Sequence, residues 1–271
     1  MRRALIFLAI VVASGALDIA LHMAGSDLMP MLSVFSALVY WFGFGGVVMV
    51  WIALAFTGMG LVFLVWAPRM AGRGWQKGLR YGLALGLMIL IAMFEGVGLL
   101  GTPLLGEFAM GMADALPIFL MISALGWALV PDGDGAPTRE QRPVWPVLTI
   151  FALVYGGGRT GVQALGLIES GLAERLLPSL IWPFAMGAAI GVLFLVIADA
   201  LRGLSRGRTA LAFGIGAFGA NWALFMVFVP MVFPDALLDT ALRVGLDILF
   251  VTCAALLLGR VAVDVRQHKE Q

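Results

Sequence analysis

Charged residues are scarce in this sequence. Only 12% of the 271 residues are Asp, Glu, Lys or Arg, whereas 62% are hydrophobic and the mean hydropathy is +1.02. Soluble domains are about 25% charged and about 45–50% apolar. This shortage of charge excludes a soluble enzyme and a disordered protein. The net charge of +1 also gives no field that would steer nucleic acid to the chain, so no nucleic-acid partner is expected.

Cysteine and histidine are almost absent. The single cysteine, Cys253, cannot form a disulfide within the chain, which excludes a disulfide scaffold. Of the two histidines, His268 lies in a charged tail, so His22 has no second imidazole in an apolar run with which to ligate a haem. The sequence also has no P-loop, GxSxG, HExxH or CxxC motif. No reaction is indicated by a motif, and no cofactor is expected.

Long apolar runs are what the sequence does contain. A transmembrane helix needs about 20 apolar residues, and polar segments separate runs of that length. The pattern predicts an all-α, polytopic integral membrane bundle of about eight transmembrane helices, with the lipid bilayer as its lateral partner. The predicted spans are 4–24, 43–67, 81–101, 108–130, 146–167, 178–201, 209–232 and 237–259.

The apolar stretch at 28–68 is too long for one crossing. As a single helix it would be about 60 Å long, whereas the hydrocarbon core is about 30 Å thick. Either residues 29–42 form a separate helical or re-entrant piece at the outer face, with Pro30 near its start, or the stretch crosses twice around Gly43. The distribution of positive charge favours the first alternative, because a ninth crossing would scatter it over both sides.

Positive residues fall on one side of an eight-span chain. Fourteen lie at the termini and in the even-numbered loops, and the other side holds only Arg175. The positive-inside rule then predicts that both termini are cytoplasmic, and the expected location is a bacterial plasma (inner) membrane. The fourteen are Arg2, Arg3, Arg69, Arg73, Lys77, Arg80, Arg139, Arg142, Arg202, Arg206, Arg208, Arg260, Arg266 and Lys269.

The N-terminus has a second interpretation. Arg2-Arg3, the apolar residues 4–13 and Ser14-Gly15-Ala16 fit the three regions of a signal peptide. The apolar character continues to Ala24, however, which favours an uncleaved first helix.

The spans divide into two halves of four, residues 1–130 and 144–271, joined by a cytoplasmic loop at 131–143. If the halves are repeats, four helices per unit make them parallel, related by an axis along the membrane normal. The alignment needs gaps and gives few identities, so chance similarity among apolar helices is the alternative. Shifts of 141 and 133 residues bring polar positions into register: Asp18 with Arg159, His22 with Gln163, and Asp114 with Asp247.

Several ionisable residues fall inside the predicted spans, where each costs about 2.5–3.5 kcal/mol on insertion scales. Counted along their helices, all lie at the midplane or in the outer half. This shared depth predicts a polar cavity open to the outer side, which would form a substrate or ion pathway. Ion pairs that only hold helices together are the alternative. The pathway residues are Asp18, Glu95, Asp114, Arg159, Arg243 and Asp247, with Asn221 at a similar depth.

Arg159 follows three glycines within Tyr155–Gly161. Either the helix unwinds there and binds an anionic group together with Arg159, or the glycines let a neighbouring helix approach closely. In both cases the charged guanidinium needs acceptors. Arg159 is therefore predicted to lie within reach of an acid on another span, and the repeat alignment favours Asp18 over the others, which are Glu95, Asp114 and Asp247.

Methionines accompany His22 near the predicted outer end of the first span. Thioethers suit Cu(I), so an outward-facing copper path is one interpretation. Methionine is also a common filler of apolar cores, and this alternative is favoured, so no metal site is assigned. The residues of the weak Cu(I) option are His22, Met23, Met29 and Met31.

Three functions are compatible with these features. The favoured one is a permease or channel for a small solute or ion that uses the buried charge cluster. The second is a non-catalytic membrane subunit or assembly partner of a larger complex, or a homo-oligomer. The third, and least favoured, is an intramembrane enzyme that acts on a lipid-like substrate with Asp114 as its base.

Reporter fusions test the eight-span topology, which the 14-to-1 charge asymmetry predicts. Fusions after Arg73 and Gly203 should report the cytoplasm, and fusions near Asp27 and Pro234 should report the outer side. An outer-side signal at Arg73 would contradict eight spans and favour two crossings within residues 28–68.

Overall fold

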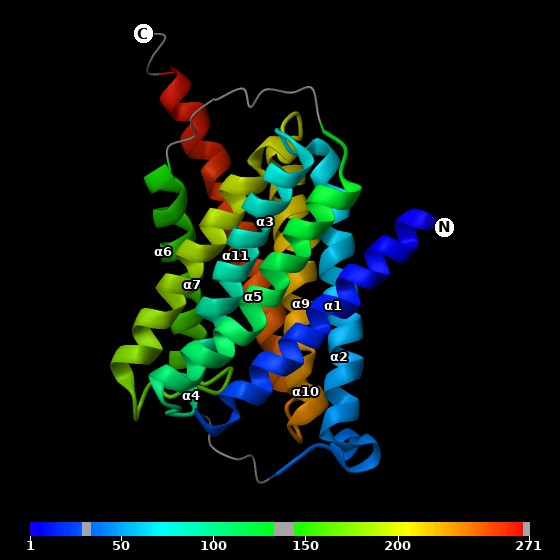
Figure 1. Cartoon of the computed structure of the whole chain (residues 1–271). Helices are drawn as coiled ribbons and strands as arrows, with labels where there is room; N and C mark the ends of the chain where they lie inside the picture. The colour runs from blue at the N-terminus through cyan, green and yellow to red at the C-terminus, as the bar shows by residue number, and fades with distance from the viewer. Residues whose placement is uncertain (29–33, 133–143, 268–271) are drawn as a thin grey trace.

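The computed structural model describes residues 1–28, 34–132 and 144–267. All regular structure within these ranges is helical, and the long helices run side by side as one bundle (Figure 1). The predicted all-α membrane bundle is therefore confirmed. Within the described ranges, seven helical segments are long and apolar enough to cross a membrane: Arg2–Leu28, Ala37–Arg69, Gly74–Leu99, Leu104–Leu129, Leu176–Leu201, Arg206–Val232 and Leu237–Leu258.

An eighth helix, α6 (Val144–Ala164), is 21 residues long but less apolar, because its second half carries glycines, Arg159 and Gln163. Each of the eight predicted spans thus corresponds to a helix or a short series of helices. The other elements, in chain order, are α1 (Arg2–Gly25), η1 (Ser26–Leu28), α2 (Ala37–Trp66), η2 (Ala67–Arg69), α3 (Gly74–Met93), α4 (Glu95–Leu99), α5 (Leu104–Leu129), α7 (Leu176–Ile197), η3 (Ala198–Leu201), α8 (Arg206–Leu211), the π-helical η4 (Ala212–Gly219), α9 (Ala220–Met226), α10 (Phe228–Val232) and α11 (Leu237–Gln267).

The break predicted in the long second stretch lies at Gly43. Its φ of 72° and ψ of 155° are non-helical and divide α2 into a short helix from Ala37 and a long spanning helix. Ser36 begins the short piece, because its hydroxyl accepts from the Val39 N–H and donates to the Met231 carbonyl of α10. A single straight helix through this stretch is thus excluded, whereas Pro30 lies outside the described residues.

The third span begins earlier than predicted, at Gly74 rather than at residue 81. Lys77, which the sequence places in a cytoplasmic loop, is therefore buried in the first turn of α3. Arg80 donates to the carbonyls of Gln76 and Ala71 and so stays at the helix end. Long basic side chains can lie along apolar surface near a helix end, which is why their charge does not mark the helix boundary.

Glycines bring the backbones of α3 and α5 into contact. A Cβ atom on Gly78 would lie 2.7 Å from the carbonyl oxygen of Ile122 and 3.0 Å from the Cα atom of Gly126. On Gly126, a Cβ atom would lie 2.6 Å from the Cα atom of Gly78. Small residues at such crossings allow the close packing that drives helix association in membranes.

The glycine-rich segment of α6 also serves packing. α6 is helical throughout this segment, so the local unwinding considered from the sequence is wrong. A Cβ atom on Gly156 would lie 2.6 Å from Cδ1 of Phe184, and one on Gly158 would lie 2.7 Å from Cδ1 of Phe250. These glycines therefore admit aromatic rings from α7 and α11.

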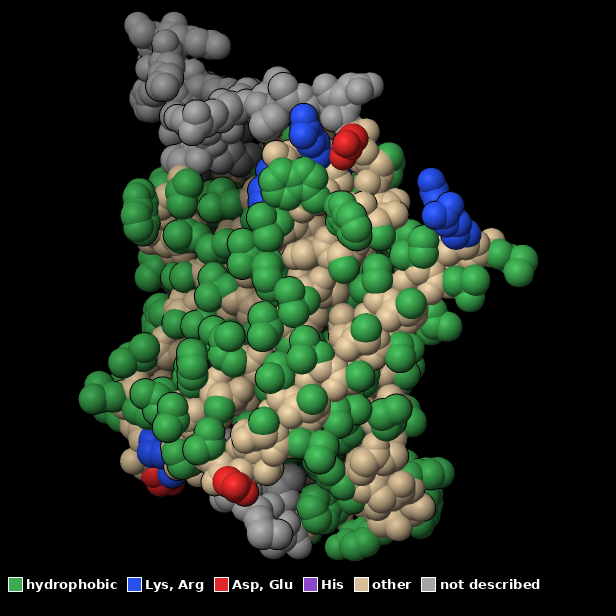
Figure 2. All heavy atoms as spheres, in the orientation of Figure 1, with side chains coloured by type: hydrophobic (Ala, Val, Ile, Leu, Met, Phe, Trp, Pro, Cys, Tyr) green, Lys and Arg blue, Asp and Glu red, His purple; other side chains and the backbone are tan. Residues whose placement is uncertain are grey.

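The face of the bundle drawn in Figure 2 is covered by hydrophobic side chains, and the charged side chains visible there lie toward its two ends. This distribution is what a lipid-facing surface requires, because a charge in the hydrocarbon region is unfavourable. Five of the ionisable residues predicted to line the pathway are instead buried inside the bundle, and Glu95 is partly buried: the five are Asp18, Asp114, Arg159, Arg243 and Asp247.

Replacing Gly78 with alanine should destabilise the protein by about 1–3 kcal/mol, because the new methyl group meets the backbone of α5. The measurement is unfolding in mixed micelles. Gly157→Ala is the matched control, since a Cβ atom at Gly157 has no neighbour within 4 Å among the described residues. Equal stability of the two variants would contradict direct backbone contact between α3 and α5.

Candidate functional site

The residues predicted to form one polar cluster lie in separate groups. The first group, named here the arginine network, contains Glu95, Arg159, Arg243 and Asp247, together with Asp239, which the sequence did not single out. Two further groups lie elsewhere: the carboxylate–histidine site, made of Asp18, His22 and Asp114, and a neutral pair, Asn221 with Tyr81.

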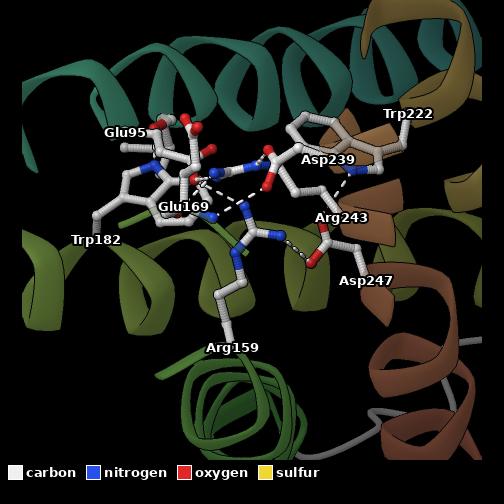
Figure 3. Close-up of polar contacts among 9 residues, drawn as sticks. Glu95, Arg159, Glu169, Trp182, Trp222, Asp239, Arg243 and Asp247 are labelled. Carbon is white, nitrogen blue, oxygen red and sulfur yellow. Dashed lines mark hydrogen bonds and ion pairs between the residues drawn. The ribbon is translucent and has the colours of Figure 1, made fainter. Parts of the chain in front are cut away.

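Arg159 is the centre of the arginine network (Figure 3). Its side chain is fully buried, with Nη1 donating to Oδ1 of Asp247 at 2.8 Å and Nη2 donating to Oε1 of Glu95 at 2.7 Å. The prediction that an acid of another span lies within its reach is confirmed. The preference for Asp18 is wrong, because Asp18 faces His22 in the carboxylate–histidine site.

Arg243 of α11 completes the network. Its Nη1 donates to the same Glu95 oxygen at 2.7 Å, its Nη2 donates to the Glu169 carbonyl at 2.6 Å, and its Nε donates to Asp239. Arg243 and Asp247 are one helical turn apart on α11, but among the described ion pairs they do not pair with each other. The partner at this spacing is Asp239, one turn before Arg243, and Asp247 faces Arg159 instead.

Two tryptophans that sequence reasoning missed enclose the network. The guanidinium carbon of Arg159 lies 5.4 Å from the ring centroid of Trp182, within cation–π range. Trp222 donates its Nε1–H to Oδ2 of Asp247 at 2.9 Å, so both carboxylate oxygens of Asp247 have donors. An indole N–H inside a span needs an acceptor, and this requirement could have singled out both residues.

A small cavity adjoins the network. It is lined by Glu95, Gln163, Ser179 and Trp182, among others, and has room for about one water molecule. The Oε1 atom of Gln163 and the Oγ atom of Ser179 are buried without a hydrogen-bond partner in the described part of the chain. The charges of the network are nevertheless matched by fixed partners, which is the arrangement of a scaffold.

The carboxylate–histidine site lies where α1 packs against α5. Nδ1 of His22 is 3.5 Å from Oδ2 of Asp18, and Nε2 is 3.7 Å from Oδ1 of Asp114. Asp18 is 1% exposed and Asp114 4% exposed, whereas the His22 side chain is 35% exposed. The site thus combines two buried acids with a histidine that is accessible from outside the bundle.

Local sequence explains why these side chains meet. Asp18 and His22 are one helical turn apart and so share a face of α1. Gly25, near the end of α1, lets Met110 of α5 approach, because a Cβ atom there would lie 2.5 Å from the Met110 methyl carbon. The next turn of α5 carries Asp114, which is thereby brought to His22.

The two charged groups differ in the basic residues that pair with their carboxylates. Among the described ion pairs, the basic partner of both Asp18 and Asp114 is His22 rather than an arginine or a lysine. Oδ1 of Asp18 is buried without a hydrogen-bond partner in the described ranges. The arginine network contains two permanently charged guanidinium groups, whereas among the described ion pairs the carboxylate–histidine site contains no arginine or lysine.

Asn221 belongs to neither charged group. It follows the π-helical segment η4, and its Nδ2 donates to the hydroxyl oxygen of Tyr81 at 2.9 Å and to the Ala217 carbonyl at 2.7 Å. π-Helical segments frequently accompany functional sites, and the bond from Asn221 joins α9 to α3. Its placement in the ion pathway stays a prediction.

The structure does not favour the weak Cu(I) option. His22 faces two carboxylates, which are harder donors than Cu(I) prefers, and Met23 is exposed. Met29 and Met31 lie outside the described residues.

Arg159→Ala should lower the free energy of unfolding by about 3–5 kcal/mol, because it leaves Asp247 buried without its ion-pair partner. Unfolding in mixed micelles measures this. Arg202→Ala, in the more exposed pair with Asp199, should change stability by at most about 1 kcal/mol. Equal losses in both variants would show that the arginine network is hydrated.

The chain was compared with protein-family models, with curated proteins and with solved structures, and no match was found. The seven long apolar helices within the described ranges identify it as a membrane protein, and a more specific function has to be argued from the chemistry of the two charged groups.

Proposed function

We propose that the protein is a permease for a small cation, which binds between Asp18 and Asp114 beside His22. One observation carries this proposal: two buried carboxylates share a site in which the basic partner among the described residues is a histidine. The proposal concerns the carboxylate–histidine site, and the arginine network acts as the frame.

Electrostatics supplies the first argument. A carboxylate removed from water is unfavourable unless it is paired, and two neighbouring carboxylates repel each other. Asp18 and Asp114 therefore need a positive charge close by. A bound cation or proton can supply that charge and leave again, whereas an arginine side chain is permanently charged and fixed. Reversible neutralisation inside a membrane is what a cation permease requires.

The proposed repeat supplies a second, independent argument. The first and fourth helices of each half pack together, α1 with α5 and α6 with α11. The register of the halves matches Asp18 with Arg159 and Asp114 with Asp247. In the second half, the acid of the fourth helix is neutralised by Arg159 at 2.8 Å. In the first half an acid stands in the position of that arginine, so the same neutralisation requires a mobile cation.

The distribution of positive charge along the chain indicates which side of the membrane the proposed site faces. With cytoplasmic termini in a bacterial inner membrane, the end of α1 that carries His22 faces the outer side. The partial exposure of His22 would then give a cation access from that side.

A membrane subunit without transport activity is the second candidate. The arginine network favours it, because every charge of the network has a fixed partner and the network joins α4, α6 and α11 as a scaffold. Stoichiometric co-purification with other membrane proteins, without cation flux, would support this candidate.

Proteoliposome flux assays test the permease. Wild-type protein should carry a cation across the vesicle membrane, with protons, Na⁺, K⁺, Mn²⁺ and Zn²⁺ assayed in turn by entrapped indicators. Asp18→Asn and Asp114→Asn should each reduce the flux at least about tenfold, because each amide removes a charge that neutralises the cation. The measurement is the initial rate at matched protein density.

Glu107→Gln is the matched control. Glu107 is a buried acid on the same helix as Asp114, but its carboxylate accepts from the Thr102 hydroxyl, outside the carboxylate–histidine site. Its flux should equal that of the wild type. Folded wild-type protein that carries none of these cations, or flux that is unchanged in both aspartate variants, would contradict the proposal.

A further inference from the structure

We propose, in an inference that rests on the proposed function, that the cation is a divalent transition-metal ion of the Zn²⁺ and Mn²⁺ class. Its ligands are Asp18, Asp114 and one ring nitrogen of His22. The three side chains each offer one donor atom, and these atoms lie within 4.8 Å of one another. The metal class follows from the donor set, the charge and the hydrogen bonding of the histidine.

The donor set selects among metals. One imidazole nitrogen with carboxylate oxygens suits Zn²⁺, Mn²⁺, Fe²⁺ and Co²⁺. Ca²⁺ and Mg²⁺ prefer oxygen ligands, and Cu(I) prefers thiolates and thioethers. Because His22 supplies a nitrogen ligand, the expected substrate is a transition-metal ion rather than an alkaline-earth ion.

Hydrogen bonding indicates which nitrogen of His22 coordinates. Nδ1 lies 3.0 Å from the backbone carbonyl oxygen of Asp18, to which a protonated Nδ1 donates. This tautomer leaves the lone pair on Nε2, which faces Asp114. A metal-binding histidine commonly donates its other N–H to a carbonyl or carboxylate, which fixes the ring and raises its basicity. Asp18 would thus both supply a ligand and orient the ring.

Distances within the site are compatible with one shared ion. Two ligands at about 2.0–2.2 Å from a metal lie at most about 4.4 Å apart. Nε2 of His22 and Oδ1 of Asp114 are 3.7 Å apart, and the full set spans no more than 4.8 Å. Neighbouring ligands of a tetrahedral ion lie about 3.4 Å apart, so binding requires the three side chains to close in by on the order of an ångström.

Charge favours a divalent ion over a monovalent one. A metal ion binds the ionised form of both carboxylates, so with a neutral imidazole the three ligands carry two negative charges, which a single divalent ion neutralises. Oδ1 of Asp18 is buried without a hydrogen-bond partner in the described part of the chain, so it is an acceptor available to a cation. Three protein ligands leave open positions for water, as in sites that exchange ligands.

Equilibrium binding tests the site separately from transport. The full chain in detergent, treated with chelator and dialysed, is titrated calorimetrically with Zn²⁺ and Mn²⁺, and with Mg²⁺ and Ca²⁺ for comparison. We expect one transition-metal ion per chain and at least tenfold weaker Mg²⁺ and Ca²⁺ binding. Asp18→Asn, Asp114→Asn and His22→Gln should each weaken Zn²⁺ or Mn²⁺ binding at least tenfold.

Matched controls address non-specific binding. Glu107→Gln removes another buried acid, and His268→Gln removes the second histidine of the chain. Both should bind like the wild type. If the aspartate variants do not fold, Co²⁺ absorption of the wild-type protein gives a second readout, since d–d bands of nitrogen and oxygen ligation should appear and should be lost in His22→Gln.

The possible results separate the two proposals. Metal binding that requires the three residues, without flux, supports the metal site and overturns the permease. Flux of protons or Na⁺ that requires Asp18 and Asp114, without transition-metal binding, supports the permease and overturns the metal site. Metal binding that is unchanged in all three variants is adventitious and also overturns the metal site. The absence of both binding and flux overturns both proposals.

Discussion

Buried charge must be neutralised inside this bundle, and the ion pairs of Arg159 show how the fold does so. The guanidinium joins α6 to Asp247 of α11 and to Glu95 of α4, and Trp182 of α7 covers it. Four segments, of which only α6 and α7 are consecutive in the chain, are therefore held in one arrangement. Because an unpaired charge at this depth would be strongly unfavourable, α4 of the first half and α11 of the second half both have to place an acid at the guanidinium.

The first half meets the same constraint with different residues. The α1–α5 interface carries Asp18, His22 and Asp114, and the ion pairs there involve a histidine rather than an arginine. This difference gives the molecule one charged group with permanent partners and one group whose neutralisation depends on what binds. The proposed cation site and the proposed frame are thus two outcomes of a single electrostatic requirement.

Close packing makes both groups possible. Contacts at Gly78 and Gly126 bring α3 and α5 together at the backbone, and Gly25 admits Met110 one turn from Asp114. A charged side chain can be paired across an interface only if the helices approach closely enough for its acceptors to reach it. At the α1–α5 interface, the close approach at Gly25 and the pairing of buried Asp114 with His22 are therefore related features.

By itself, the sequence determined that the chain is an all-α membrane bundle and approximately where its spans lie, because the apolar run length is a local property. The sequence further indicated that Asp18, Asp114, Arg159, Arg243 and Asp247 are buried, because charge in lipid is penalised, but it missed the buried Lys77 and Glu107. It also indicated the break near Gly43. It could not show which acid meets which base. Asp18, Glu95, Asp114 and Asp247 have similar depths, and helix neighbours and rotations decide their partners. Only the tertiary structure assigned Glu95 and Asp247 to Arg159, and Asp18 and Asp114 to His22, because such pairing depends on side-chain directions across interfaces between distant segments.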